Sequence, residues 1–498
     1  MKVLVIGLDG ADPDFILKHK EDLPFISNMI DNGVFGKLRS TIPPLSATAW
    51  ASLMTGKNPG KTGIIDFLHK GRVINSKNIK EPCIWDLLGL YKRKVGLVNI
   101  PLTYPPKRVN GFMITGMLTP SEEKEFTYPA EIKYELKNYK ISESWRHYSD
   151  DKKFLKALYE ITDIRIDNIK YLMNNKDWDF FMFVISETDS IQHFYLKPAD
   201  HEKHKEGQEI ILEYFKFLDK KLSEVADIDC NIFIMSDHGF GKVPLKRVNL
   251  NFWLNEKGLY SFSIEEKFKT RIKGKLVKIY THPFMDKFRR YIPKKLLYKS
   301  KNLLQEERGD NIAFFTSSFL NTGFITINAK RKKKIISRVI RGLRNLHDPE
   351  NKKRIIDEIY RREEIYSGRY IDDIPDIIFL FSELYYGDES SPTFIERVTH
   401  TKFLSGHRID GIFIAHGPDI RKGYKIKNVE IIDLCPTILH MFGLPIPIDV
   451  DGKVLKEIFR EDSKIIRKKI IYRDDYKKQL EKEMIRAKIK QLKMEKRI

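Results

Sequence analysis

The chain has 498 residues, of which 42% are hydrophobic and 12% aromatic, and its formal net charge is +21. This length is large for a single core, so we expect one large α/β domain with insertions or two domains. Its three cysteines, Cys83, Cys230 and Cys435, lie far apart, which excludes a metal or redox motif based on cysteine spacing and argues against a disulfide-stapled secreted protein. Such rare cysteines fit a reducing cytoplasm, so we expect a cytoplasmic protein. No apolar run approaches the roughly 20 residues that span a bilayer.

Two segments carry most of the positive charge. Residues 267–308 contain 14 Lys and Arg against three acids, and residues 464–498 contain 14 against five. Together they supply 20 of the 21 net charges, so the rest of the chain is nearly neutral and a nucleic-acid partner is not expected. The first segment interleaves apolar residues with lysines, which suits packing on the core or peripheral contact with an anionic membrane surface. Frequent Lys, Glu and Ile are also typical of thermophiles.

Short apolar strands alternate with helices through the first half of the chain. Strands are predicted at residues 3–6, 95–100, 112–116, 178–185 and 231–235, and helices at residues 24–32, 85–91, 151–174 and 210–225. The helix at 151–174 has the clearest pattern, because its apolar residues recur at helical spacing. This alternation predicts an α/β fold with a doubly wound, mostly parallel central sheet and helices on both faces.

The whole chain is predicted to divide into four segments. These are an α/β core (residues 1–261 and 381–460), a basic helical insertion (262–311), a small α+β unit placed like a cap (312–380) and a basic C-terminal helix or tail (461–498). Apolar runs predict strands at 324–328 and 377–380 in the small unit. A strand at 411–415 and a helix at 433–442 are expected to complete the core.

Residues 43–63, with the sequence PPLSATAWASLMTGKNPGKTG, contain the first candidate for chemistry. Two prolines precede Ser46, and the small and apolar residues after it predict a short helix that begins there. Ser46 is therefore expected at the N-cap, where backbone N–H groups and the helix dipole point at any bound oxyanion. Its hydroxyl can cap the helix or attack phosphorus as a nucleophile. Lys57 and Lys61 are interpreted as loop lysines.

Acidic residues follow three of the predicted core strands. Asp9 follows the first strand, Asp189 follows the strand that ends at residue 185, and Asp237 and His238 follow the strand that ends at residue 235. In an open α/β sheet the carboxyl ends of parallel strands meet at one edge, where such folds place their chemistry. We therefore expect these four side chains to lie close together.

Two further histidines can join this cluster. His193 lies four residues after Asp189, which places both side chains on one face of a helix, and His407 stands just before the strand at 411–415. Each residue alone has an ordinary explanation, such as a turn cap or a buried core histidine. Together they predict a divalent-metal site, and the mixture of carboxylate and imidazole favours zinc or manganese over magnesium.

The motifs GLDGAD, PPLSATAWASLMTG, ETDSIQH, SDHGF and SGH occur in this order and resemble those of the alkaline phosphatase superfamily. The chain looks most like the type I phosphodiesterase/nucleotide pyrophosphatase branch, over residues 1–261 and 312–453. The order is specific, although no single motif is. The resemblance implies an alkaline-phosphatase-like fold and a metal-dependent hydrolase that cleaves a phosphodiester or phosphoanhydride in a phosphorylated small-molecule or lipid substrate.

The resemblance also implies two divalent metal ions, Zn²⁺ or else Mn²⁺, and a role for each candidate residue. The implied ligands are Asp189, His193 and His407 for one ion and Asp9, Asp237 and His238 for the other. Ser46 is implied to be the fourth ligand of the second ion and the nucleophile, which leads to a covalent phospho-Ser46 intermediate.

Two departures from the family pattern leave alternatives open. Well-studied phosphodiesterases of this branch use Thr where this chain has Ser46, and they carry an Asn that is missing from residues 63–67. Serine is usual in phosphomonoesterases and cofactor-independent phosphomutases of the superfamily, so these activities are the first alternative. A non-catalytic protein that binds anionic surfaces is the second. Arg146, His147 and Lys402 are further residues that can contact a substrate.

Overall fold

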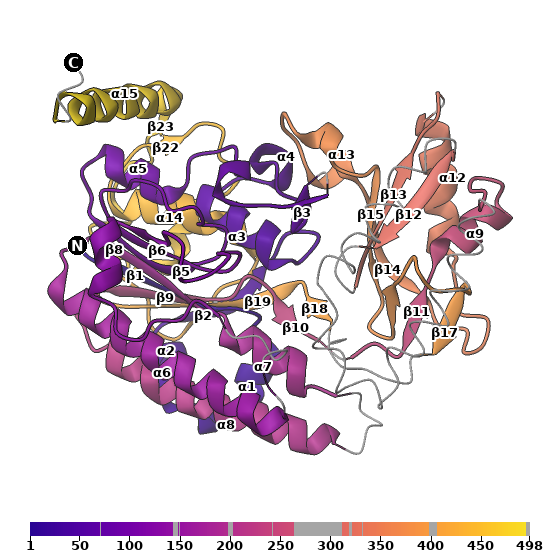
Figure 1. The fold of residues 1–498 in the computed structure, drawn as a ribbon, viewed down its shortest axis with the longest axis horizontal. Helices are drawn as coiled ribbons and strands as arrows, with labels where there is room; N and C mark the ends of the chain where they lie inside the picture. Colours follow the sequence, from indigo (N-terminus) through magenta and orange to yellow (C-terminus); the bar gives the residue numbers. More distant parts are fainter. Residues whose placement is uncertain are drawn as a thin grey trace.

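The computed structural model describes residues 1–69, 71–142, 148, 150–197, 203–241, 243–262, 311–317, 321–330, 332–397 and 406–494. Two lobes lie side by side in Figure 1: a larger lobe with a sheet between two layers of helices, and a smaller lobe built on a second sheet. The predicted basic insertion falls outside the described residues except at its two ends, residues 262 and 311.

Among the described residues, a ten-stranded mixed sheet of order β20-β2-β19-β9-β1-β8-β5-β6-β7, with β21 also paired to β2, organises the larger lobe. Its strands are β1 (Val3–Leu8), β2 (Val34–Arg39), β5 (Val95–Ile100), β6 (Gly111–Thr115), β7 (Thr127–Tyr128), β8 (Phe180–Ile185), β9 (Asn231–Met235), β19 (Asp410–His416), β20 (Tyr424–Lys425) and β21 (Val429–Glu430). The middle strands β9, β1, β8, β5 and β6 are parallel, whereas β19 is antiparallel to both of its neighbours. The predicted α/β fold class is confirmed.

The middle strands are covered on both faces, which explains their unbroken apolar sequences. Every residue of β1 (VLVIGL) and of β8 (FFMFVI) is buried, as is typical of parallel strands between two layers of helices. Alternate side chains point to opposite faces of a strand, so Val3 and Val5 enter one hydrophobic core while Leu4 and Ile6 enter the other.

Helices cover both faces of this sheet (Figure 1). One layer contains α1 (Pro13–Lys18), α2 (Pro24–Asp31), α6 (Asp151–Asn175), α7 (Glu187–Tyr195) and α8 (His204–Val225), and the other contains α3 (Ser46–Thr55), α4 (Pro59–Thr62), α5 (Ile84–Leu90) and α14 (Leu434–Met441). The helices predicted for the core are all present, and α8 begins six residues earlier than predicted. The Asp150 side chain caps α6 by accepting a hydrogen bond from the Lys153 backbone, which fixes the start of that long helix.

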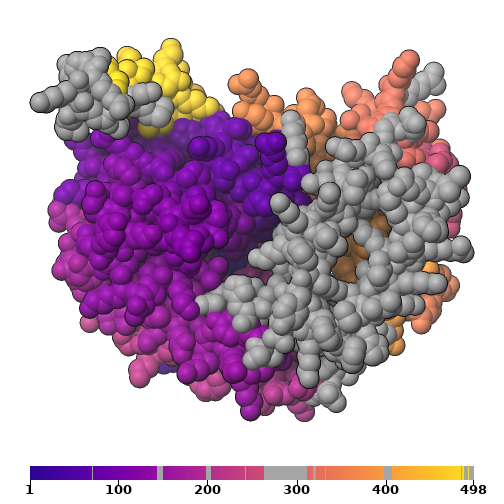
Figure 2. Space-filling view, in the orientation of Figure 1, coloured from indigo at the N-terminus to yellow at the C-terminus, as the bar shows by residue number. Residues whose placement is uncertain are grey.

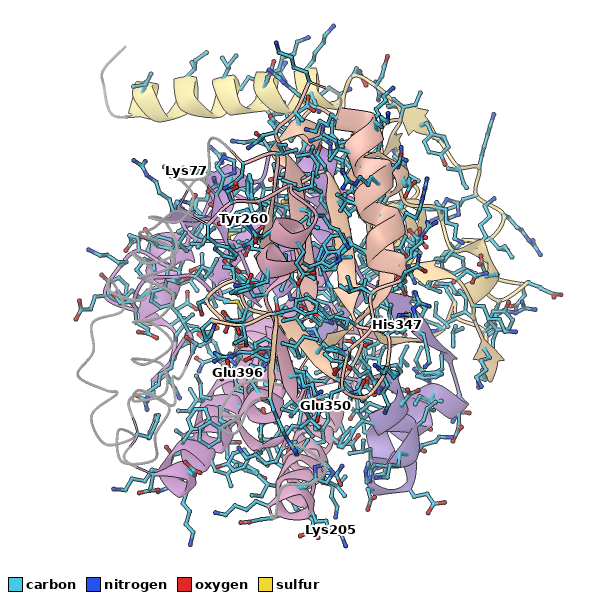
Figure 3. The ribbon with its side chains drawn as sticks, turned by 90° about the vertical axis from the view of Figure 1, so that its right-hand side faces the viewer. Lys77, Lys205, Tyr260, His347, Glu350 and Glu396 are labelled. Carbon is cyan, nitrogen blue, oxygen red and sulfur yellow. The ribbon has the colours of Figure 1, made fainter. Side chains whose placement is uncertain are left out.

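The smaller lobe contains an antiparallel sheet of order β12-β13-β15-β14. Its elements are β12 (Ala313–Ser317), β13 (Thr322–Ile327), β14 (Ile356–Arg361), β15 (Ile377–Phe381), α12 (Lys332–Arg344) and α13 (Arg362–Ile365). Figure 3 views this lobe with α12 in front of the strands and His347 and Glu350 below the end of the helix. A second sheet of order β16-β11-β17 lies beside it, with β11 (Lys246–Val248), α9 (Leu250–Glu256), β16 (Tyr385–Gly387) and β17 (Ile395–Arg397).

Hydrophobic packing does not follow the predicted segment boundaries at residues 261 and 381. Val248, Trp253 and Tyr385 belong to the same buried cluster as Phe315 and Phe379 of the smaller sheet. The smaller lobe therefore recruits chain from both sides of the segment that we predicted for it.

Short elements complete the fold. They are the strands β3 (Leu68–His69), β4 (Arg72–Val73), β10 (Gly239–Phe240), β18 (His407–Arg408), β22 (Ile446–Pro447) and β23 (Tyr472–Arg473), and the 3₁₀ helices η1 (Lys20–Asp22), η2 (Ser76–Asn78), η3 (Ala130–Tyr134), η7 (Ile371–Asp373), η8 (Ile431–Asp433) and η9 (Lys456–Ile458). Among the described helices, none has the length and apolar character that crossing a membrane requires.

The C-terminal helix α15 (Tyr476–Met494) lies against the larger lobe, where Figure 2 shows its yellow atoms beside those of the N-terminal part of the chain. Lys57 lies on the loop between α3 and α4, as predicted, but its side chain is only 1% exposed. Its ammonium group donates to Glu81 at 2.6 Å, to Asp449 at 2.7 Å and to the Tyr476 hydroxyl at 2.8 Å. A buried cation needs such partners, so Lys57 ties the segment that follows α3 to the C-terminal segment.

Candidate active site

The candidate residues meet at the edge of the main sheet where β1, β8 and β9 end. Asp9 directly follows β1, Asp237 and His238 follow β9, and Asp189 lies on α7, which begins two residues after β8. Both β8 and β9 pair with β1 in parallel, so their carboxyl ends lie at the same edge. The predicted convergence of these four residues is therefore present in the fold.

His407 reaches this edge from a much later part of the chain. It begins β18, which pairs antiparallel with β10 so that His407 lies opposite Phe240. Figure 1 shows this small pair of strands between the two lobes. The pairing places His407 next to the segment that carries His238.

Asp9, Asp237 and His238 form the first of two groups whose donor atoms lie within 4.8 Å of one another, and we call it the inner group. All three side chains are 0% exposed. His238 Nε2 lies 3.3 Å from Asp237 Oδ2 and 3.6 Å from Asp9 Oδ1. Two carboxylates and one imidazole at such distances are a donor set that zinc and manganese accept.

Asp189, His193 and His407 form the second group, which we call the outer group. Asp189 Oδ1 lies 3.3 Å from His193 Nε2 and 3.7 Å from His407 Nε2. The side chains of Asp189 and His193 are 16% and 13% exposed, so this group is more open to solvent than the inner group. The helical spacing of Asp189 and His193 produces their contact, as predicted.

The two groups adjoin each other and Ser46. The rings of His238 and His407 stack with their centroids 3.6 Å apart, so one imidazole of each group forms the boundary between them. Ser46 Oγ donates to Asp9 Oδ1 at 3.3 Å and lies 3.2 Å from His238 Nε2. The serine hydroxyl therefore faces the inner group.

Ser46 is not the N-cap of α3, contrary to our prediction. The helix begins with Ser46 itself, and Leu45 occupies the N-cap without any side-chain hydrogen bond. The Ser46 hydroxyl is thus directed at Asp9 and His238 instead of the helix backbone. The neighbouring Thr48 hydroxyl is buried and has no hydrogen-bond partner among the described residues, so Ser46 is the better candidate for a nucleophile.

Backbone carbonyl groups set the orientation of two imidazoles. His238 Nδ1 lies 3.0 Å from the Gly239 carbonyl oxygen, and His407 Nδ1 lies 2.9 Å from the Pro44 carbonyl oxygen. A carbonyl oxygen only accepts hydrogen bonds, so each Nδ1 carries the proton and each Nε2 presents a lone pair to the carboxylates. This is the tautomer that a metal ligand requires.

Unpaired carboxylate oxygens test whether the residues fit metal ions. Asp189 Oδ1 and Asp237 Oδ2 are buried and accept no hydrogen bond from the described residues, although imidazole nitrogens lie 3.3 Å from both oxygens. Electron pairs that face one another in a buried place are satisfied together by a cation between them. The donor sets of both groups therefore fit divalent metal ions.

The pKa values of the two groups shift in opposite ways. Burial, reinforced by repulsion from other carboxylates, raises the pKa of Asp9 well above its usual value and that of Asp237 to about 6. Burial also opposes ionisation of Asp189, but the neighbouring imidazoles outweigh it and lower its pKa. Burial lowers the pKa of His238 to about 4 and that of His407 well below its usual value, so both imidazoles are neutral near pH 7.

Three residues that we did not predict support the inner group. Trp50 Nε1 donates to Asp9 Oδ2 at 3.2 Å, and Gln192 Nε2 donates to the Gly10 carbonyl oxygen at 3.0 Å. Gly10 has a φ of +67°, which residues with a side chain rarely adopt. A Cβ atom there would also lie 3.2 Å from Asp189 Oδ1 and crowd that carboxylate. Trp50 lies four residues after Ser46, and this helical spacing was a signal that sequence analysis could have used.

A buried ion pair positions the start of α7. Arg165 on α6 is 0% exposed and forms an ion pair with Glu187, the first residue of α7. Its guanidinium group also donates to the carbonyl oxygens of Ile141 at 2.7 Å and Lys140 at 3.2 Å. Arg165 falls within the apolar stripe of a predicted helix, and a charge at such a position indicates a buried partner.

The smaller lobe contacts the active site at two points. The Tyr366 hydroxyl accepts a hydrogen bond from the Ile42 backbone N–H at 2.8 Å and donates to the Ile42 carbonyl oxygen. Asn321 donates to the carbonyl oxygen of His407. One lobe therefore holds both the loop that precedes Ser46 and one residue of the outer group.

Lys61 has partners away from the candidate site. Lys61 donates to the Asp449 carbonyl oxygen at 2.8 Å and pairs with Asp451, which is a structural role like that of Lys57. Arg146, His147 and Lys402 lie outside the described residues.

Comparisons with solved structures show the same fold in two groups of proteins. Murine ectonucleotide pyrophosphatase/phosphodiesterase 5, solved as an inactive variant in complex with AMP, is 15% identical, with a TM-score of 0.52 over 92% of this chain and 100% of that one. The human protein of the same name is 14% identical, with a TM-score of 0.52 over 93% and 100%. Phosphonoacetate hydrolase from Sinorhizobium meliloti 1021, in complex with phosphonoacetate, is 13% identical, with a TM-score of 0.50 over 87% and 94%.

A sequence comparison identifies the family. No curated protein matches the chain, but the family described as type I phosphodiesterase/nucleotide pyrophosphatase matches residues 3–393. This match spans more than half of the chain and includes every candidate site residue except His407. The chain therefore belongs to the type I phosphodiesterase/nucleotide pyrophosphatase family of the alkaline phosphatase superfamily, and it is a hydrolase.

Proposed function

We propose that this hydrolase cleaves a phosphodiester or phosphoanhydride bond through a covalent intermediate on Ser46, at a site that binds two divalent metal ions, Zn²⁺ or else Mn²⁺. The position of Ser46 carries the proposal. Its oxygen lies within 3.3 Å of two donor atoms of the inner group. The outer group is adjacent, because the ring of His407 stacks on that of His238.

Each residue has a task in this reaction. Two divalent ions lower the pKa of the serine hydroxyl and offset the charge on the phosphoryl oxygens when they are bound. The inner-group residues Asp9, Asp237 and His238 would hold one ion, and the outer-group residues Asp189, His193 and His407 would hold the other. Trp50 and Gly239 fix the orientation of Asp9 and His238.

The bond changes follow from the position of Ser46 at the start of α3. Its hydroxyl loses its proton to water as the oxygen forms a bond to phosphorus. At the same time the bond from phosphorus to the leaving oxygen breaks, and that oxygen takes up a proton from water. The backbone N–H groups of the first turn of α3 stabilise the phosphoryl oxygens. Water then attacks phosphorus, the bond to Ser46 breaks, and the hydroxyl is restored.

The substrate class follows from the family and from the covalent intermediate. We propose a phosphorylated small molecule or lipid with a diester or anhydride bond. A monoester is the competing substrate, because Ser46 stands where Thr is usual in phosphodiesterases. A diester leaves its remaining ester group on the phosphoryl–Ser46 adduct, whereas a monoester leaves a plain phosphoryl group.

Acid quenching followed by mass spectrometry tests both points. The metal-loaded protein is mixed with bis(p-nitrophenyl) phosphate or with p-nitrophenyl phosphate, quenched and digested. We expect a nitrophenylphosphoryl adduct on the Ser46 peptide with the diester, and nitrophenol release that stops when metal is removed. Turnover without an adduct on Ser46 would place the nucleophile elsewhere, and turnover of the monoester alone would replace the proposed substrate class.

A further inference from the structure

A third basic region lies on the smaller lobe, far from the residues of the active site in sequence. Residues 332–361 contain ten Lys and Arg against four Asp and Glu. Helix α12 buries Ile336, Val339, Ile340 and Leu343 against the sheet, so its lysines and arginines are left on the outer face. Figure 3 shows this face of the lobe toward the viewer.

Two adjoining hollows lie between α12 and β14. One has a volume of about 500 Å³ and is lined by Arg344, Arg354, Asp357 and Ile359. The other has a volume of about 340 Å³ and is lined by Ser337, Ile340, Arg341, Arg344, Asn345, Arg361 and Glu364. Because Arg344 lines both, we treat them as one feature, the arginine groove, defined by Arg341, Arg344, Arg354 and Arg361.

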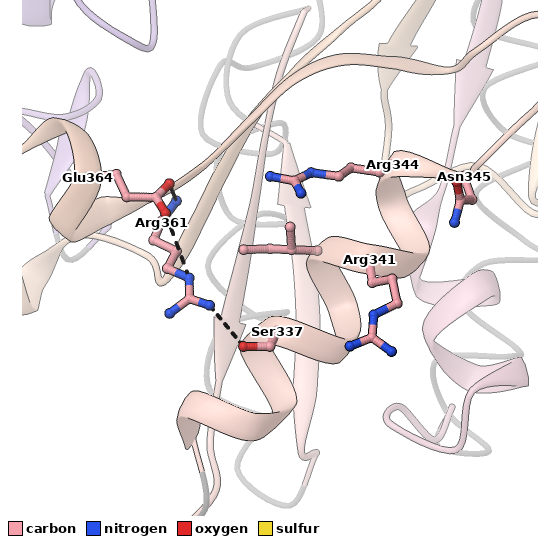
Figure 4. A pocket seen from close by; sticks show the side chains of 7 residues that line it. Ser337, Arg341, Arg344, Asn345, Arg361 and Glu364 are labelled. Carbon is pink, nitrogen blue, oxygen red and sulfur yellow. Dashed lines mark hydrogen bonds and ion pairs between the residues drawn. The ribbon is translucent and has the colours of Figure 1, made fainter.

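Three of these four arginines have unused hydrogen-bonding capacity. Among the described residues, the guanidinium groups of Arg341, Arg344 and Arg354 form no ion pair and no side-chain hydrogen bond, although Arg354 attracts the nearby carboxylate of Asp357. Arg361 differs, because it donates to Ser337 Oγ at 2.8 Å and lies 3.8 Å from Glu364 (Figure 4). Figure 4 also shows Arg344 extending from α12 toward the side of the groove that carries Arg361.

The lining carries a net positive charge despite its two acids. Asp357 and Glu364 offset two of the four arginines, and Glu364 is held by Arg361 on one side of the groove. Arginine presents a planar fork of donors that binds phosphate oxygens in pairs, which lysine does not. The free donors of the groove therefore suit phosphoryl groups.

We propose that the arginine groove is a non-catalytic binding site for a soluble compound with two or three linked phosphoryl groups. The volumes of the hollows fall in the range of small-molecule sites. Two hollows that share Arg344 offer room for adjacent phosphoryl groups. The site is separate from Ser46, since its residues lie on α12, on β14 and next to these elements, and none comes from the sheet edge of the active site.

The surroundings of the groove argue against two larger partners. None of the exposed large hydrophobic side chains of the described residues lies between residues 332 and 364, so the surface has nothing to insert into a bilayer. Residues 332–361 contain no Phe or Trp, and their single Tyr, Tyr360, is partly buried and donates its hydroxyl to Glu358. A stacking platform for single-stranded nucleic acid is therefore missing from this part of the chain.

Titration calorimetry with inorganic pyrophosphate and tripolyphosphate tests the proposal. The full-length protein is first freed of metal by chelation and dialysis into metal-free buffer, so that the active site does not bind the probe through its ions. We expect one site per chain for wild type, and at least tenfold weaker binding for Arg344→Gln and Arg354→Gln. Lys333→Gln is the matched control, because Lys333 is exposed on the same helix but does not line the groove.

Further measurements separate the groove from the active site and define the results that would overturn the proposal. Ser46→Ala should bind pyrophosphate as wild type does, which separates the groove from the proposed catalytic function. No binding by wild type, or equal weakening by Lys333→Gln and Arg344→Gln, overturns the proposal. It is also overturned if Arg344→Gln abolishes binding to phosphatidylglycerol vesicles or to a single-stranded RNA while wild type ignores pyrophosphate. Thermal unfolding of each variant confirms that it is folded.

Discussion

The inner and outer groups use the same two kinds of side chain in opposite proportions. The inner group has two carboxylates and one imidazole, all fully buried. The outer group has one carboxylate and two imidazoles, of which Asp189 and His193 are partly exposed and His407 is buried. The direction of the pKa shifts follows from this difference. Burial and the neighbouring acids raise the pKa of Asp237, whereas the neighbouring histidines outweigh burial and lower the pKa of Asp189.

The two groups also differ in how the fold holds them. The inner group comes from the ends of the adjacent strands β1 and β9 in the larger lobe, and Trp50 fixes one of its carboxylates. The outer group combines α7, which Arg165 anchors, with β18, which Asn321 of the smaller lobe contacts. We therefore expect the inner group to be the fixed partner of Ser46 and the outer group to be the part that responds to substrate and to the smaller lobe.

Replacing the nucleophile should have the largest effect. Ser46→Ala is expected to lower kcat by at least about 1,000-fold, or roughly 4 kcal/mol of barrier, because it removes the oxygen that we propose as the nucleophile. Both groups keep their three residues, so metal content should stay near two ions per chain. Metal analysis and nitrophenol release from a diester measure the two quantities.

The control for this change is Thr48→Val, which removes a buried hydroxyl from the same helix and keeps the shape of the side chain. It should leave kcat within a few-fold of wild type. Comparable losses in both variants would mean that the helix, and not the Ser46 oxygen, was responsible.

Removing one residue from each group separates their roles. Asp237→Asn and His193→Asn should each lower metal content from two ions to about one and kcat by about 100-fold, or roughly 2.7 kcal/mol. The remaining ion should leave quickly to a chelator in Asp237→Asn, since the outer group is partly exposed, and slowly in His193→Asn. Equal rates of removal would contradict the difference in burial between the groups.

Sequence reasoning reached the active site because strand ends are readable from sequence. Asp9, Asp189 and Asp237 each follow a buried apolar strand, and parallel strands bring such ends together. His193 followed from helical spacing. His407 was included because it stands just before the strand at 411–415, and the β10–β18 pairing places it at this edge. The family resemblance added the pairing of residues into two groups.

Sequence patterns did not predict contacts between segments that are far apart in the chain. The burial of Lys57 could not be predicted, because its partners Glu81, Asp449 and Tyr476 come from other parts of the chain. The arginine groove was not predicted, because acidic residues elsewhere in the chain balance the positive charges of α12. The net charge of the sequence therefore indicated only the two longer basic segments. The prediction that Ser46 is the N-cap was wrong by one residue, because Leu45 occupies that position. Helix ends are commonly placed one or two residues apart by different criteria.

Loosening the contact of the smaller lobe should have a moderate effect. Tyr366→Phe removes the hydroxyl that satisfies both the N–H and the carbonyl oxygen of Ile42, and leaving buried polar groups unpaired costs about 1–3 kcal/mol. Because Ile42 lies four residues before Ser46, we expect kcat to fall a few-fold with unchanged metal content. Tyr385→Phe is the matched control, since that hydroxyl donates to Asp348 at 2.9 Å within the smaller lobe. Equal kinetics for Tyr366→Phe and wild type would show that the contact does not position Ser46.

The smallest effects, in the metal-free protein, should differ in sign between the groups. The pKa of Asp237 is raised in the folded state from 3.8 to about 6, so the folded protein binds more protons than the unfolded chain between these values, and stability falls as pH rises through them. At pH 7 the ionised carboxylate opposes folding, and Asp237→Asn should raise the melting temperature. The pKa of Asp189 is lowered in the folded state, so its charge stabilises the fold above pH 4, and Asp189→Asn should lower the melting temperature.

Thermal unfolding followed by circular dichroism, after chelation and dialysis, measures both changes, which should be on the order of 1–3 kcal/mol. Lowering the pH from 7 to 5 provides a second readout. Asp237 becomes largely protonated in the folded wild type at pH 5, so the advantage of Asp237→Asn should shrink by about half, whereas the deficit of Asp189→Asn should persist because Asp189 remains ionised in the folded state. Asp227→Asn, at an exposed position, controls for the loss of one negative charge from a basic protein. Shifts of the same sign for Asp237→Asn and Asp189→Asn would contradict the electrostatic difference between the two groups.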